Sequence, residues 1–157
     1  MLQHALSGTI RRVKIDPSPT LGVRAFMMRK ADAPDWRDQV TILAAGPVAE
    51  ARISGWQTYP CEMQDHYPDR HTDCARIAAI ASENAPEQPG EAYQTAFAEA
   101  SELLSRILIW RAVLDLAGRL LQARIMPGAD AHAIIETHII AGSLVGFRRT
   151  YDFETDE

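Results

Sequence analysis

Apolar residues recur at the spacing of a helix face through most of the chain beyond its first thirty residues, and this pattern restricts the fold more than any other feature. In the segment 36–54, Val40, Leu43 and Pro47 lie three or four residues apart on one such face. Gly46 and Pro47 are costly in a helix interior, at about 1 and about 3 kcal/mol relative to alanine. We therefore expect either one kinked helix or two shorter helices, the second opening at Pro47.

Two further helical regions follow, separated by prolines. Thr72 is suited to cap a helix over residues 73–84. The long segment 91–125 carries two apolar stripes whose phase changes near residues 108–111, which predicts two packed helices rather than one rod. The apolar run 107–110 is expected in the core.

The first thirty residues favour extended structure instead. Residues 9–15 are rich in β-branched side chains at a period close to two, and residues 21–28 offer a second extended run. Two prolines in the intervening residues 16–19 predict a turn, so the two runs should form a hairpin. At the other end of the chain, a turn at residues 126–128 precedes a short helix over 129–138. The predicted fold class is mainly α, with a small N-terminal β-hairpin followed by a bundle of about five helices.

The length of the chain limits the number of domains, and its charge limits the kinds of partner that it can bind. The 157 residues fit a single domain, with a hairpin region at 1–30, a helical bundle at 36–140 and a frayed acidic tail at 152–157. The formal net charge of −5 argues against a nucleic-acid surface, because that partner rewards clustered Lys and Arg. The chain has no stretch of 18 apolar residues, so no membrane span is expected. Two cysteines are too few for a disulfide framework, which indicates a reducing, cytoplasmic setting.

An irregular polar segment at residues 56–70 interrupts the helical pattern, and loops of this length are more often functional than accidental. The densest cluster of metal-ligating residue types lies across it and the next helix start: Cys61, Glu62, Asp65, His66, Asp69, His71, Asp73 and Cys74. Its Cys and His spacing matches no standard structural zinc pattern. The simpler interpretation is a solvated loop followed by a small core cysteine. The sequence contains no glycine-rich phosphate loop, no G-x-S-x-G and no H-E-x-x-H.

Several short strings nevertheless occur in a recognisable order. The extended runs read TIRRVKIDP and LGVRAF. Residues 45–50 then read AGPVAE, with Gly55 after them, and residues 71–78 read HTDCARIA. Two helical segments and an Ile-Met-Pro-Gly turn at residues 125–128 complete the series.

Together these strings resemble the peptidase domain of the FtsH-type ATP-dependent zinc metalloproteases, and in particular small stand-alone bacterial proteins that look like that domain without its ATPase. In that family a strand pair precedes a helix with a pattern like AGRxAEE and then a Gly. A loop ending in a pattern like SNDLxxAT follows, and its Asp is the third zinc ligand. The resemblance spans most of residues 8–138.

The resemblance implies a zincin-like fold without its first helix, zinc as the family's cofactor, and a protein or peptide substrate. Asp73 matches the third zinc ligand, while Ala45, Gly46 and Glu50 match the structural helix motif. The HExxH ligands and base are absent from the chain, so we assign no catalytic residue. Because tight metal binding needs three or more converging ligands, zinc should not bind to this chain alone, and the chain should not hydrolyse peptides.

Three hypotheses follow. In the first, the chain is an N-terminally truncated peptidase whose HExxH lies upstream of Met1. If His4 were the second His of HExxH, the Glu of the motif would fall at Met1 and its first His would fall before Met1. In the second, it is a non-catalytic binding or assembly module that forms homo-oligomers through the face left by the missing helix. In the third, it is an unrelated helical regulator, and Asp73 is merely a first-turn acid stabilised by the helix dipole.

Overall fold

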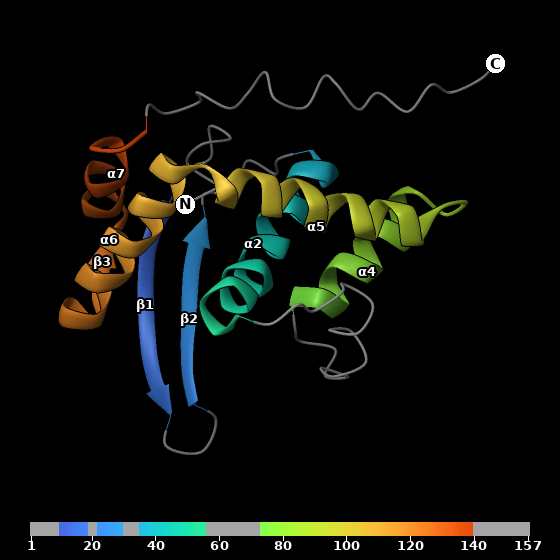
Figure 1. Ribbon diagram of the computed structural model, residues 1–157. Helices are drawn as coiled ribbons and strands as arrows, with labels where there is room; N and C mark the ends of the chain where they lie inside the picture. Colours follow the sequence, from blue (N-terminus) through green and yellow to red (C-terminus); the bar gives the residue numbers. More distant parts are fainter. Residues whose placement is uncertain (1–9, 19–21, 30–34, 56–72, 140–157) are drawn as a thin grey trace. The chain divides into compact units, whose positions relative to one another are not determined.

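A computed structural model describes residues 10–18, 22–29, 35–55 and 73–139 (Figure 1). The described part of the chain forms five helices and a three-stranded sheet: β1 (Ile10–Ser18), β2 (Gly22–Arg29), α2 (Trp36–Ser54), α4 (Asp73–Asn84), α5 (Pro89–Ser105), α6 (Ile107–Ala123), β3 (Ile125–Pro127) and α7 (Gly128–Glu136). The prediction of a mainly helical chain with an N-terminal antiparallel hairpin is therefore confirmed. The chain divides into two compact units, one made of Met1–Ala31 with Arg111–Glu157 and the other of Asp32–Trp110.

In the unit Asp32–Trp110, helices α2, α4 and α5 pack on one another. Small and aliphatic side chains fill their shared core, and the least exposed are Val40, Ala44, Ile77, Ala81, Ala96, Ala100, Leu103 and Leu104. The Asp35 side chain accepts a hydrogen bond from the Arg37 backbone N–H at 3.2 Å and opens α2. Gly55 ends this helix in the left-handed conformation at φ 68°, which glycine adopts without strain.

Helix α2 is continuous through Gly46 and Pro47, so the alternative of two shorter helices is wrong. The loss of one backbone hydrogen bond at Pro47 is offset by the packing of both halves of α2 against α4 and α5. The tertiary contacts of the whole helix thus outweigh the local propensity of two residues.

Helices α5 and α6 meet at Arg106, whose backbone is extended at φ −68° and ψ 126°. The division into two helices agrees with the shift in apolar phase, although the break lies before residues 108–111. The expectation of a buried run at 107–110 holds for Ile109 and is wrong for Ile107 and Leu108, which are 65% and 50% exposed. Because the extended backbone at Arg106 interrupts the helical periodicity, the stripe of α5 does not continue onto α6.

The other unit contains the sheet, whose strand order is β2-β1-β3 with both pairs antiparallel (Figure 1). β1 runs on through Pro17 to Ser18, so the predicted turn at residues 16–19 is wrong for residues 16–18. Because β3 pairs only with residues 12–14, the Pro17 end of β1 has a single strand neighbour among the described residues and tolerates a proline.

The segment predicted as a turn at residues 126–128 is β3 at its first two positions and the start of α7 at Gly128, so that prediction is wrong. Met126 pairs with Val13 of β1, and both side chains are buried, at 5% and 8% exposure. This pairing joins residues more than a hundred positions apart, which a local pattern does not reveal. Helix α7 packs on β1 and β3.

Some predictions lie outside the described residues. These include the irregular segment 56–70 with its candidate ligands Cys61, Glu62, Asp65, His66 and Asp69, then His71 and the cap at Thr72, and the acidic tail at 152–157. Among the helices that are described, none combines the length and apolar character needed to cross a bilayer.

Candidate functional site

Asp73 opens helix α4 and lies against the middle of helix α2. A Cβ added to Gly46 would lie 3.8 Å from Asp73 Oδ2, which is an ordinary van der Waals contact. The carboxylate of Asp73 therefore lies near the α2 backbone at Gly46, with room for a methyl group between them. The structure therefore brings together Asp73 and the Ala45–Gly46 pair, which the sequence analysis selected from separate strings.

Asp73 has a nearby cation on its own helix. Arg76 Nη1 lies 3.3 Å from Asp73 Oδ1, and the two side chains are 47% and 46% exposed. An exposed ion pair of this kind contributes about 0–1 kcal/mol, so it holds the carboxylate only weakly. Asp73 therefore stays accessible to solvent while its second oxygen faces Gly46.

Cys74 lies directly beneath this surface and is buried at 3% exposure. Burial raises the pKa of its thiol, and the negative charges of Asp73 and Glu50 raise it further, against a lowering hydrogen bond with Tyr93. The charges of Glu50 and Asp73 thus act on the same buried atom, although the Glu50 side chain is exposed. A protonated, buried thiol is a core group and a poor nucleophile or metal ligand.

These residues do not by themselves fit a zinc ion. Across residues 10–18, 22–29, 35–55 and 73–139, no three His, Cys, Asp or Glu side chains converge as metal ligands would. Asp73 offers one accessible carboxylate, and Cys74 beside it is buried and protonated. One oxygen donor cannot supply the coordination that a catalytic zinc needs.

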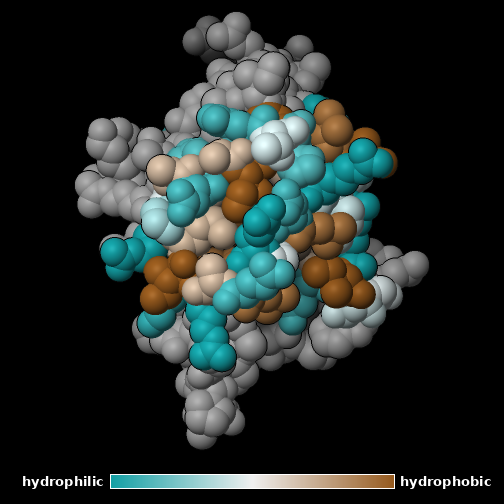
Figure 2. All heavy atoms as spheres, turned by 90° about the vertical axis from the view of Figure 1, so that its left-hand side faces the viewer, coloured by the Kyte–Doolittle hydropathy of each residue, from teal (hydrophilic) through white to brown (hydrophobic). Residues whose placement is uncertain are grey.

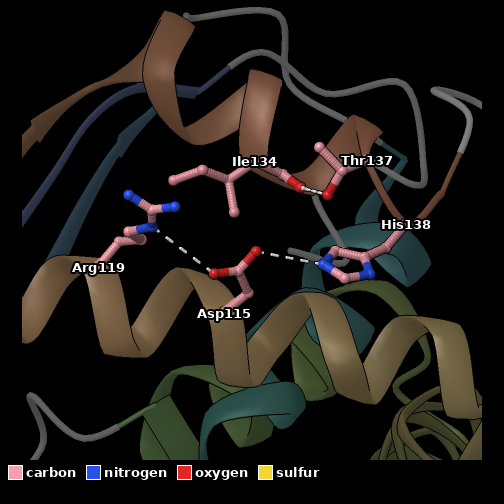
Figure 3. Close-up of polar contacts among 5 residues, drawn as sticks. All are labelled: Asp115, Arg119, Ile134, Thr137 and His138. Carbon is pink, nitrogen blue, oxygen red and sulfur yellow. Dashed lines mark hydrogen bonds and ion pairs between the residues drawn. The ribbon is translucent and has the colours of Figure 1, made fainter.

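A second polar cluster, absent from the sequence analysis, joins α6 to the end of α7 (Figure 3). His138 Nε2 lies 3.3 Å from Asp115 Oδ2, and Arg119 Nε lies 3.8 Å from Asp115 Oδ1. The hydroxyl of Thr137 donates to the carbonyl of Ile134 at 2.7 Å, so it is not available to the imidazole. With no nucleophile beside it in the described residues, the Asp115–His138 pair ties two helices together.

Helices α2 and α5 share a buried polar contact that the sequence analysis also missed. Thr41 is 1% exposed, and its Oγ1 donates to Glu99 Oε2 at 2.7 Å, with the Arg37 carbonyl 3.0 Å away. Further along the same helix pair, the Arg52 guanidinium donates to the Leu104 carbonyl and stacks 4.0 Å from the centre of the Trp110 ring. Neither pairing has a local signal, because each joins residues about fifty positions apart.

The chain was compared with protein-family models, with curated proteins and with solved structures, and none of them matches it.

Proposed function

We propose that the chain is a zinc-metallopeptidase-like domain of the FtsH type that carries the third-ligand position, Asp73, and is not a peptidase by itself. The motif strings support the proposal because they occur in the family's order along the chain. The chain contributes one carboxylate, while the HExxH that would complete the site is absent from its 157 residues.

The observation that carries this proposal is that the carboxylate of Asp73 lies near Gly46 of α2. The resemblance selects Asp73 and the Ala45–Gly46 pair independently, and the first turn of α4 lies against that point of α2. Asp73 is partly exposed at the start of α4, next to Gly46 of α2. In the proposal, the HExxH helix would bring its ligands to this carboxylate.

The test compares the 157-residue chain with a longer chain that includes the in-frame codons preceding Met1. If these codons encode HExxH, we expect the longer chain to bind one zinc ion and to cleave casein, and the 157-residue chain to do neither. The Asp73→Asn variant of the longer chain should lose both properties.

Asp130→Asn is the matched control, because Asp130 is the first-turn acid of α7 and its loss has the same helix-dipole cost. The control should keep zinc and activity. A stop codon before any HExxH, or equal effects of the two substitutions, would contradict a ligand role for Asp73.

The second candidate is a non-catalytic binding or assembly module. The observation favouring it is the set of large apolar side chains on α6 that are exposed to solvent, among them Leu114 at 50% and Leu121 at 67%. A concentration-dependent increase in mass by sedimentation, abolished by Leu114→Gln with Leu121→Gln, would support assembly through this helix. A monomer at every concentration would contradict it.

A further inference from the structure

A single residue separates helices α5 and α6. Arg106 has an extended backbone, at φ −68° and ψ 126°, and helical geometry resumes at Ile107. The Arg106 N–H donates to the Leu103 carbonyl at 3.2 Å, and the Trp110 N–H donates to the Arg106 carbonyl at 2.9 Å. The hydrogen-bond ladder of α5 therefore ends at this residue and that of α6 begins there. Because a few dihedral angles at the end of a helix can absorb a conformational change, Arg106 is suited to be a hinge.

The side chain of Arg52, in the last turn of α2, binds on both sides of Arg106. Its guanidinium donates a hydrogen bond to the carbonyl of Leu104 and lies 4.0 Å from the centre of the Trp110 ring. Leu104 is in the last turn of α5, where carbonyl groups have no partner within the helix. Trp110 is in the first turn of α6. One planar guanidinium thus caps α5 and stacks on the start of α6.

Apolar packing holds the first turn of α6 at few positions. Ile107 and Leu108 are 65% and 50% exposed, whereas Ile109 is buried at 2% and Trp110 is partly buried. Figure 2 shows hydrophobic side chains on the surface among hydrophilic ones, on the side of the molecule where Figure 1 draws α6. Because one side chain of this turn is fully buried, the contacts made by Arg52 are a large share of what fixes the turn.

The turn that Arg52 holds is also where the chain passes from one compact unit to the other. The unit Asp32–Trp110 ends inside α6, and this helix continues without a break through Arg111 to Ala123. We propose that Arg52 is a clamp across a hinge at Arg106. Its contacts, all within the unit Asp32–Trp110, hold the end of α5 and the start of α6 in one arrangement and so restrict movement where the two units connect. Loss of the clamp frees α6 to rotate about Arg106.

The experiment measures the distribution of distances between α5 and α6 in the full chain, by double electron–electron resonance of two spin labels. The labelled protein carries four substitutions, which remove the native thiols and place the labels at two exposed positions: Cys61→Ser, Cys74→Ala, Ser101→Cys and Gln122→Cys. We expect one narrow distribution in this parent protein. Adding Arg52→Gln should make it about twofold wider, because glutamine lacks the guanidinium that binds both helices. Trp110→Leu, which removes the aromatic face and keeps Arg52, should widen it as well.

Arg37→Gln is the matched control, because Arg37 is an exposed arginine of the same helix whose guanidinium lies 5.0 Å from the centre of the Trp36 ring, within α2. It should leave the width unchanged. In the unlabelled chain, Arg52→Gln should speed hydrogen exchange of the Trp110 amide about tenfold and leave the amide of Ala81, in the buried core, unchanged. Circular dichroism checks that each variant retains its helices.

Three results would each overturn the proposal. The first is a distribution as narrow in Arg52→Gln and Trp110→Leu as in the parent protein. The second is an equal widening in Arg37→Gln. The third is an equal increase in exchange at Trp110 and Ala81, because that would show a general loss of stability instead of movement at Arg106.

Discussion

At the scale of single residues, Asp73 lies near Gly46, and this proximity brings together two of the sequence motifs in the fold. A methyl group at Gly46 would meet Asp73 Oδ2 at 3.8 Å, which requires no adjustment. Gly46 lies in the interior of α2, where alanine is more favourable than glycine by about 1 kcal/mol. Gly46 therefore destabilises α2 relative to alanine, although there is room for a methyl group at this position.

We predict that Gly46→Ala raises the free energy of unfolding by about 0.5–1 kcal/mol, measured by urea denaturation. Gly118→Ala is the matched control, since Gly118 lies inside α6 with nothing within 4 Å of an added Cβ. The two variants should gain similar stability. A loss of stability in Gly46→Ala alone would mean that the approach of α4 to α2 tolerates no side chain.

Cys74 gives a prediction about pH. Its pKa is raised in the folded chain, chiefly by burial, so the folded state holds the thiol proton more tightly than the unfolded state does. The protonated thiol's contribution to the free energy of unfolding is fully present below the pKa of about 8.5 that a cysteine has in the unfolded chain. It is lost as the pH rises through the higher pKa of the folded chain.

We therefore expect the wild-type chain to lose more stability than Cys74→Ala between pH 8 and pH 10, when both are measured by urea denaturation. Titrations of other groups are common to the two proteins and cancel in the difference. A stability difference between them that stays constant over this range would contradict a raised pKa for Cys74.

At the scale of helices and strands, the periodic pattern predicted the bounds of α2 and α4 and the existence of two helices where α5 and α6 lie. It failed where distant pairing decides the structure. β3 forms because Met126 meets Val13 across the sheet, and no local pattern in Ile125–Pro127 shows this. Among the site residues, the proximity of Asp73 to Gly46 joined two selected strings, whereas Asp115 with His138 depends on helix packing alone.

The contact between α2 and α5 supplies a prediction at this scale. Thr41→Val keeps the shape of the buried side chain but removes the hydroxyl that donates to Glu99. It should lower the free energy of unfolding by about 1–2 kcal/mol, because the partly buried carboxylate loses a donor.

Adding Glu99→Gln to each background completes a double-mutant cycle measured by urea denaturation. The destabilisation caused by Thr41→Val should be smaller in the Glu99→Gln background, because the charge-assisted hydrogen bond from the Thr41 hydroxyl to the carboxylate is already lost there. Equal costs in both backgrounds would show that the hydroxyl does not act through Glu99.

At the scale of the whole molecule, the chain is mainly helical, and we propose that it supplies one carboxylate, that of Asp73, to a zinc site whose other ligands it lacks. The fold class follows from hydrophobic periodicity, since helices need only local spacing. The function cannot be predicted in the same way. An acid such as Asp73 in the first turn of a helix is common, and only ligands from other segments beside it would indicate a metal site.

The most direct test is the zinc content of the purified 157-residue chain, measured by elemental mass spectrometry after gel filtration in buffer containing micromolar zinc, alongside Asp73→Asn and the control Asp130→Asn. The account predicts far less than one zinc per chain in all three proteins, together with no hydrolysis of casein, because the single carboxylate of Asp73 is not a zinc site. One tightly held zinc per chain, lost in Asp73→Asn and kept in Asp130→Asn, would contradict it.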